Sequence, residues 1–227
     1  MSAAEPPFSP EFFEREDESN DALFYTEPRL LVHIDEQAIA AVSQLFLDLI
    51  SPDSVVLDLM SSWRSHWPQD HPKERMVGLG LNAAEMQANP DLDEFVIHNV
   101  NEDPVLPFED ESFDAVVITV SVQYLKRPVE TFRQVYRILR QDGLLIVTFS
   151  NRMFPTKAVR IWRVSTDKGR MGLVAAYLEE AGEFVDVHGD LANPETSPPG
   201  DPIFFVTGRK ESDLDRFAAK LSALSGQ

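Results

Sequence analysis

Along residues 35–150 the hydrophobic pattern alternates between two periods. Short, nearly continuous apolar runs, typical of strands buried on both faces, are separated by segments whose apolar residues recur at helical spacing. The expected strands cover residues 55–59, 76–81, 94–98, 113–120 and 144–149, and the expected helices cover 35–50, 83–88 and 128–140. Strands that alternate with helices predict an α/β fold with a doubly wound, mostly parallel sheet and right-handed crossovers.

The flanking segments have weaker patterns. Residues 1–22 are rich in Pro, Glu and Asp and lack a period, which predicts a mobile N-terminal arm. Towards the C-terminus we expect a helical region broken near residues 166–169, and then two strands at 184–187 and 203–207. Such a late pair is typical of an antiparallel edge on a parallel sheet. Residues 211–227 are expected to form a C-terminal helix.

The expected sheet also predicts where a ligand binds. In doubly wound sheets, ligand sites lie beyond the carboxyl ends of the strands, at the point where the strand order reverses. The residues that follow Leu59, Leu81, His98 and Ile118 are therefore the first candidates for a site. Residues 60–74, which follow the first of these strands, contain two prolines and little period, so a long helix is not expected there.

Composition and charge narrow the function classes. Of the 227 residues, 43% are hydrophobic and 26% are charged, as in globular proteins, and the absence of cysteine excludes disulfides, thiolate metal sites and a cysteine nucleophile. No apolar run approaches the roughly 20 residues of a membrane span, and the N-terminus lacks signal-peptide features, so we expect a cytoplasmic protein. The net charge of −18 disfavours nucleic acids and anionic membranes as partners, because it repels phosphate groups.

Four segments, in their order and spacing, carry a resemblance to a known family. They are Val56-Leu57-Asp58-Leu59, Asn99-Val100-Asn101-Glu102-Asp103, Ser112-Phe113-Asp114 and Val135–Gly143. Together they resemble the class I S-adenosylmethionine-dependent methyltransferase superfamily, and within it the methyltransferase type 11 domains. The resemblance implies a Rossmann-like fold of seven strands with an antiparallel edge, and a methyltransferase-like domain over residues 23–210. It also implies transferase activity with S-adenosyl-L-methionine as cofactor.

Two positions depart from the family pattern. The family's Gly-x-Gly-x-Gly loop lets the backbone approach the methionine portion of the cofactor, but here the loop reads Met60-Ser61-Ser62-Trp63-Arg64. The large side chains of Trp63 and Arg64 must therefore point elsewhere or fill part of the pocket. The family usually has an acidic residue after the second strand that accepts hydrogen bonds from the ribose, but this chain has Asn82. Both departures indicate a separate branch of methyltransferase-like proteins.

The resemblance implies cofactor-binding roles for residues at the strand ends: Asp58, Ser61, Ser62, Gly80, Asn82, Asn99, Val100, Asn101 and Thr119. Asp58 would orient the cofactor loop by accepting backbone N–H bonds, or would only cap the turn. Ser61 and Ser62 would contact the amino-acid moiety of the cofactor, or form a polar turn. Asn82 would supply one ribose acceptor. The segment 99–101 would hold the adenine, or be an ordinary loop.

Substrate-binding candidates lie outside these loops. Tyr25 and Arg29 precede the first long helix and could fold over the site, where Arg29 could recognise a carboxylate on a small acceptor. Tyr124 could position a substrate or be a tyrosine at the edge of the core, and its unperturbed pKa near 10 makes it a poor base. The sequence identifies no catalytic residue. His66 and His71 have a metal-ligand spacing, but no further ligand accompanies them and no metal site is expected.

Two function classes therefore stay open. The first is an S-adenosylmethionine-dependent methyltransferase that acts on a small molecule, in which proximity and alignment supply most of the rate. The second is a binding or regulatory protein that has kept the methyltransferase-like fold and lost the cofactor. An NAD-dependent oxidoreductase is disfavoured, because Gly78-Leu79-Gly80 lacks the third glycine and lies on the second expected strand.

Overall fold

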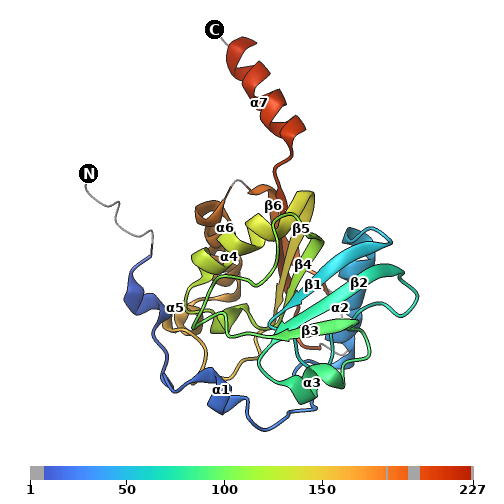
Figure 1. The fold of residues 1–227 in the computed structure, drawn as a ribbon. Helices are drawn as coiled ribbons and strands as arrows, with labels where there is room; N and C mark the ends of the chain where they lie inside the picture. Colours follow the sequence, from blue (N-terminus) through green and yellow to red (C-terminus); the bar gives the residue numbers. More distant parts are fainter. Residues whose placement is uncertain (1–7, 183, 194–199, 226–227) are drawn as a thin grey trace.

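The computed structural model describes residues 8–182, 184–193 and 200–225 and contains one seven-stranded sheet of order β3-β2-β1-β4-β5-β7-β6 (Figure 1). The strands are β1 (Ser54–Leu59), β2 (Lys73–Gly80), β3 (Glu94–Ile97), β4 (Phe113–Thr119), β5 (Leu139–Phe149), β6 (Phe184–Leu191) and β7 (Phe204–Lys210). The α-helices are α1 (Asp21–Phe24), α2 (Glu36–Leu49), α3 (Ala83–Gln87), α4 (Pro128–Ile138), α5 (Arg160–Val164), α6 (Asp167–Ala181) and α7 (Asp213–Ser225). Two short 3₁₀ helices are η1 (Pro10–Phe13) and η2 (Val122–Tyr124).

The sheet topology confirms the predicted fold class. Strands β1 to β5 pair in parallel, β7 pairs antiparallel with β5, and β6 pairs antiparallel with β7. The late strand pair therefore forms the antiparallel edge that the sequence predicted. The strand order reverses between β1 and β4, which places the expected ligand site at the carboxyl ends of these two strands.

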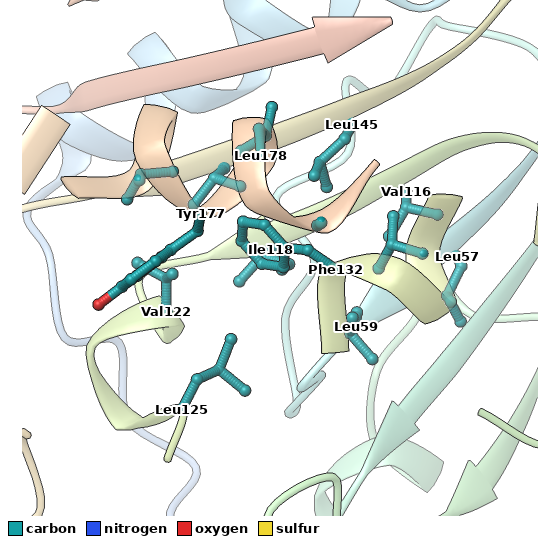
Figure 2. Packing of buried hydrophobic residues seen from close by; sticks show 14 of the residues in the cluster. Leu57, Leu59, Val116, Ile118, Val122, Leu125, Phe132, Leu145, Tyr177 and Leu178 are labelled. Carbon is teal, nitrogen blue, oxygen red and sulfur yellow. The ribbon is translucent and has the colours of Figure 1, made fainter. Parts of the chain in front are cut away.

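Both faces of the central strands are buried, which explains their continuous apolar runs. On one face, Leu57 and Leu59 of β1 and Val116 and Ile118 of β4 belong to a core cluster shared with α4 and α6, as Figure 2 shows. On the other face, the alternate residues of these strands pack against α2, whose buried residues recur at helical spacing. The two clusters hold β1 and β4 rigidly side by side at the reversal point.

One predicted boundary is wrong. The sequence predicts a helix to Arg140 followed by a turn at residues 142–143, but α4 ends at Ile138 and β5 already begins at Leu139. Leu139 has extended backbone angles and pairs with Phe113 of β4, so pairing within the sheet outweighs the local turn signal. The turn residues instead coincide with an irregularity in the register, where Asp142 adopts a left-handed conformation (φ 63°).

The N-terminal segment crosses the edge of the sheet at which β1 to β5 end, and α1 and α3 lie at this edge (Figure 1). The rings of Phe8 and Phe13 pack against Tyr177 of α6, with centroids 5.2 and 6.1 Å away. The arm predicted over residues 1–22 includes residues 1–7, which lie outside the described residues, and its mobility stays a prediction. Helix α7 extends from the opposite end of the molecule (Figure 1). In the described part of the chain, no helix combines the length and apolarity that a bilayer crossing requires.

Candidate functional site

A cavity of about 340 Å³ lies at the carboxyl ends of β1 to β5 and is covered by the N-terminal segment. Its volume is within the range of small-molecule sites. Every predicted cofactor- or substrate-binding residue except Asp58 lines it: Tyr25, Arg29, Ser61, Ser62, Gly80, Asn82, Asn99, Val100, Asn101, Thr119 and Tyr124. The structure thus brings together residues that are up to 99 positions apart (Tyr25 to Tyr124).

The loop after β1 is held from below by a buried carboxylate. Asp58 is only 3% exposed and accepts hydrogen bonds from the Ser61 and Ser65 hydroxyls at 2.6 and 2.7 Å. Burial raises the pKa of Asp58 to about 6, although the two hydroxyl donors oppose that shift. Both donors are side-chain hydroxyls, whereas the sequence suggested backbone N–H groups. Asp58 therefore orients the loop without reaching the main cavity.

The close backbone approach that the family achieves with glycines occurs here on β2. The N–H of Ser61 donates to Leu79 O at 2.8 Å, and a Cβ atom on Gly80 would lie 2.4 Å from Ser61 O. Only glycine fits at position 80 as long as the loop keeps this path. Met60, at the first turn of the loop, adopts the left-handed conformation (φ 64°) although it has a side chain.

The two large loop residues do not line the main cavity. The indole N–H of Trp63 donates to Leu31 O at 2.9 Å, and the Arg64 guanidinium lies 4.5 Å from the Trp63 ring. Both residues line a second cavity of about 80 Å³, and neither lines the main one. The glycine-free loop therefore leaves the main cavity open.

The residues after β2 form a network that the sequence did not reveal. Asn82 caps α3 by accepting from the Glu85 N–H at 3.0 Å, and its amide nitrogen donates to Tyr25 O at 2.7 Å. Glu85, which is 4% exposed, accepts from the Arg29 N–H at 2.7 Å and from the Ser62 hydroxyl at 2.6 Å. The sequence missed Glu85, because a glutamate three residues after an N-cap usually indicates only the start of a helix.

The loop after β3 links the sheet to the N-terminal segment. The Asn99 side chain accepts from the Asn101 N–H at 3.1 Å. The amide nitrogen of Asn101 donates to an Asp21 oxygen at 2.9 Å and to Tyr124 O at 3.0 Å, and its oxygen accepts from the Lys126 N–H. The side chains of this loop therefore organise the cavity wall.

Asp21 is the centre of the contacts that hold the N-terminal segment over the cavity. It forms a 2.6 Å ion pair with Arg15, and both side chains are less than 10% exposed. Lys157, after β5, lies 3.6 Å from Asp21 and donates to Ser19 O at 2.8 Å. Burial favours the neutral form of Asp21, but the hydrogen bonds from Arg15 and Asn101 outweigh this effect and lower its pKa.

Three polar atoms on the cavity wall have no hydrogen-bond partner among the described residues: Thr119 Oγ1, Ser121 Oγ and Arg29 Nη1. Thr119 and Ser121 flank Val120, which has a left-handed backbone (φ 49°), a conformation that is rare for a β-branched residue. Unpaired buried polar groups and backbone strain both cluster at functional sites. This part of the wall is therefore the best candidate for direct ligand contacts.

The remaining candidates have structural roles. The Tyr124 hydroxyl accepts from the Phe154 N–H at 2.9 Å, and burial raises the pKa of Tyr124, which makes it a still poorer base. His71 stacks on Trp67 and its Nε2 lies 2.9 Å from Ile50 O, whereas burial lowers the pKa of His66 to about 4. In residues 8–182, 184–193 and 200–225, no three His, Asp or Glu side chains gather as metal ligands would.

Comparisons with known proteins agree with this architecture. A family model described as a methyltransferase domain matches residues 71–147. The ubiquinone/menaquinone biosynthesis C-methyltransferase UbiE of Bartonella quintana (strain Toulouse) is 27% identical over 118 residues, which are 51% of this chain and 40% of that protein. The match thus spans less than half of the length of this relative.

Two solved structures illustrate the fold. The 4+2 cyclase SpnF has a TM-score of 0.57 at 15% identity, over 82% of this chain and 89% of its own. The 1,6-didemethyltoxoflavin-N1-methyltransferase of Burkholderia thailandensis was solved with 1,6-didemethyltoxoflavin and S-adenosylhomocysteine. It has a TM-score of 0.56 at 19% identity, over 78% of this chain and 80% of its own. One of these proteins is a cyclase and the other a methyltransferase, so the fold by itself does not decide the reaction.

The family match includes β2 to β4 and most of β5, the strands whose carboxyl ends, with that of β1, surround the cavity. Outside that segment, the antiparallel β7 and the edge strand β6 complete the seven-stranded order. This match and this topology agree with the resemblance to the class I S-adenosylmethionine-dependent methyltransferases that the sequence motifs carry.

Proposed function

We propose that this protein is an S-adenosylmethionine-dependent methyltransferase that acts on a small molecule. The observation that carries the proposal is the open cavity at the reversal point between β1 and β4, with the unpaired Thr119 and Ser121 hydroxyls on its wall. An unpaired buried hydroxyl costs about 1–3 kcal/mol, and a polar ligand atom would remove that cost. Because Trp63 turns away, the glycine-free loop does not block such a ligand.

The cofactor would lie along the ends of β1 to β4. Ser61, Ser62 and Thr119 would face its amino-acid moiety, with Asp58 fixing the loop from below. Gly80 and Asn82 would border the ribose, and residues 99–101 would border the adenine. The Asn82 amide is already engaged on both sides, so we expect backbone groups and Glu85 to share the recognition of the ribose. When bound, this cofactor supplies an electrophilic methyl group on a sulfonium centre.

The acceptor would occupy the part of the cavity near the ends of β4 and β5. Tyr25, Tyr124 and Phe154 give this part an aromatic wall, and the segment held by Asp21 covers it. Such a cover leaves room for a small molecule rather than a polymer. The chain's own residues would act by holding the acceptor in line with the methyl group, which requires no dedicated base.

The test is direct binding followed by transfer. Calorimetry with S-adenosylhomocysteine should give a dissociation constant around micromolar. Incubation with methyl-labelled S-adenosylmethionine and a low-molecular-mass cell extract should place the label in the small-molecule fraction. Label found only in protein or nucleic acid would refute the small-molecule acceptor. Absence of a binding response at millimolar ligand would refute the cofactor assignment.

A second candidate is a binding or regulatory protein without the cofactor. It is favoured by one observation: the side chains after β1, β2 and β3 are largely bonded to one another and to the N-terminal segment. These side chains could serve only to stabilise the fold. The same calorimetric titration separates the two candidates, because this one predicts no response to S-adenosylhomocysteine at any concentration.

A further inference from the structure

Arg29 is held in a fixed position on the cavity wall. Its backbone N–H donates to Glu85, and its Nη2 donates to Phe24 O at 3.0 Å. The guanidinium carbon lies 4.1 Å from the ring centroid of Phe24 and 5.4 Å from that of Phe154. Stacking on aromatic faces and a backbone acceptor together restrict the orientation of the guanidinium group.

The guanidinium is incompletely paired. Its Nη1 is buried without a hydrogen-bond partner, and in the described part of the chain no carboxylate lies within ion-pair distance of Arg29. By contrast, two buried cations at this edge, Arg15 and Lys157, both lie next to Asp21. In a protein with a net charge of −18, a partly buried cation without an acidic partner is unusual. An unpaired charged donor is costly, so its retention calls for a ligand.

We propose that Arg29 Nη1 forms a carboxylate subsite in this cavity, an inference that rests on the proposed function. A guanidinium group presents several N–H donors in a plane that matches the two oxygens of a carboxylate. The carboxylate belongs either to the methyl acceptor or to the amino-acid moiety of the cofactor. Phe154 follows β5, and its ring lies 6.1 Å from that of Tyr124, so the surroundings of the guanidinium suit an acceptor with an apolar body.

The test compares carboxylates with their uncharged amides. Binding of benzoate, cinnamate, indole-3-acetate and octanoate, each against its amide, is measured with wild-type protein, with and without S-adenosylhomocysteine. The variants are Arg29→Gln, Arg29→Lys and the control Arg75→Gln, whose arginine pairs with Glu94 at the other end of β2. S-adenosylhomocysteine and 5′-methylthioadenosine, which lacks the amino-acid moiety, are titrated in parallel. Thermal unfolding verifies that each variant is folded.

If Arg29 binds the carboxylate of the methyl acceptor, at least one of the tested carboxylates binds about tenfold better than its amide, and Arg29→Gln abolishes that preference. Arg29→Lys keeps part of the preference, and Arg75→Gln keeps all of it. If Arg29 binds the carboxylate of the cofactor, Arg29→Gln weakens the binding of S-adenosylhomocysteine about tenfold and leaves the binding of 5′-methylthioadenosine unchanged. If Arg29→Gln alters neither the preference for carboxylates nor the affinity for S-adenosylhomocysteine, the proposed subsite is refuted. Failure of both nucleosides to bind wild type overturns the proposed function instead, and the carboxylate series still tests Arg29.

Discussion

The two sides of the cavity treat their polar groups in opposite ways. At the ends of β1, β2 and β3, Asp58, Asn82 and Asn101 are each bonded to at least two other groups of the protein. At the end of β4, the hydroxyls of Thr119 and Ser121 have no partner among the described residues. The first side is complete without a ligand, and the second side is not.

This difference indicates what each side does. A closed network holds backbone in place, so the first side stabilises the loops that replace the family's glycines. Unpaired buried hydroxyls lower stability, and their presence on the second side is expected where a ligand supplies the missing partner. The division explains how a loop without glycine can keep its shape while the cavity stays able to bind.

The backbone shows the same division. Met60 and Val120 both adopt left-handed conformations, with φ values of 64° and 49°. The loop after Met60 is anchored by the Ser61–Asp58 bond and by the N–H of Ser61 to Leu79 O. Val120 is held by its N–H to Thr148 O at 2.9 Å and by the Gln123 amide, which donates to Val120 O at 2.8 Å. Strain of about 1–2 kcal/mol per residue persists at both places, but only the second is flanked by buried hydroxyls without a partner among the described residues.

The largest effect on stability is expected from Arg15→Ala, which would remove one of the partners that Asp21 has on the hydrogen-bonded side of the cavity. It would leave the buried Asp21 without its nearest cation, and removing one partner of a buried ion pair costs about 3–5 kcal/mol. We expect faster hydrogen exchange in residues 8–33 and lower stability in urea. Arg160→Ala is the control, because its pair with Glu11 on the same segment is mostly exposed and should contribute less than about 1 kcal/mol. Equal effects of both variants would contradict a central role for Asp21.

The next largest effect is the pH dependence of stability that Asp58 causes. Its pKa in the folded protein is about 6, above the ordinary 3.8, so the folded state binds the proton more tightly than the unfolded state does. This contribution to stability is fully present below about pH 4 and is lost as the pH rises through 6, a change of roughly 3 kcal/mol. The measurement is urea unfolding of wild type and Asp58→Asn from about pH 4 to pH 7. The difference in unfolding free energy between the two proteins should change by that amount over this pH range. A constant difference would show that folding does not raise the pKa of Asp58.

Much of this arrangement could be predicted from the sequence, because strands buried on both faces leave continuous apolar runs. Such runs located β1, β2, β4 and β5, and a short apolar run located β3, which is mostly exposed. Together they located the strand ends where a ligand would bind. The bonds made by the polar side chains were not predictable in the same way. Asn82 donates to Tyr25 O and Asn101 to Asp21, across 57 and 80 positions of sequence. Such pairs depend on the path of the N-terminal segment, for which the pattern contains no period.

Glu85 and Arg29 show the same limit. A glutamate after an N-cap and an arginine before a helix both fit ordinary surface roles. Only the folded chain shows that Glu85 is buried and bonded to the Arg29 backbone, and that the Arg29 guanidinium lies against both Phe24 and Phe154. The sequence could locate the site by topology, but not the division between its complete and incomplete sides.

The third prediction sharpens that division by separating stability from affinity. Thr119→Val and Ser121→Ala each remove an unpaired buried hydroxyl, so stability should stay equal or rise by up to about 1 kcal/mol. If ligand atoms normally pair with these hydroxyls, affinity for S-adenosylhomocysteine should fall about tenfold in each variant. Calorimetry and urea unfolding measure the two quantities. Ser65→Ala is the control on the complete side, because it removes a hydroxyl bonded to Asp58 and should lower stability more than affinity.

The smallest effect is expected at Trp63, where the question is whether the loop blocks the cavity. Trp63→Phe removes the indole N–H that donates to Leu31 O and should lower stability by about 1 kcal/mol. Its effect on affinity for S-adenosylhomocysteine should be less than about twofold, because Trp63 does not line the main cavity. Trp63→Ala should behave the same way apart from a larger loss of packing. A tenfold gain in affinity in either variant would mean that the indole enters the main cavity in solution, and the glycine-free loop would then act as a barrier rather than a support.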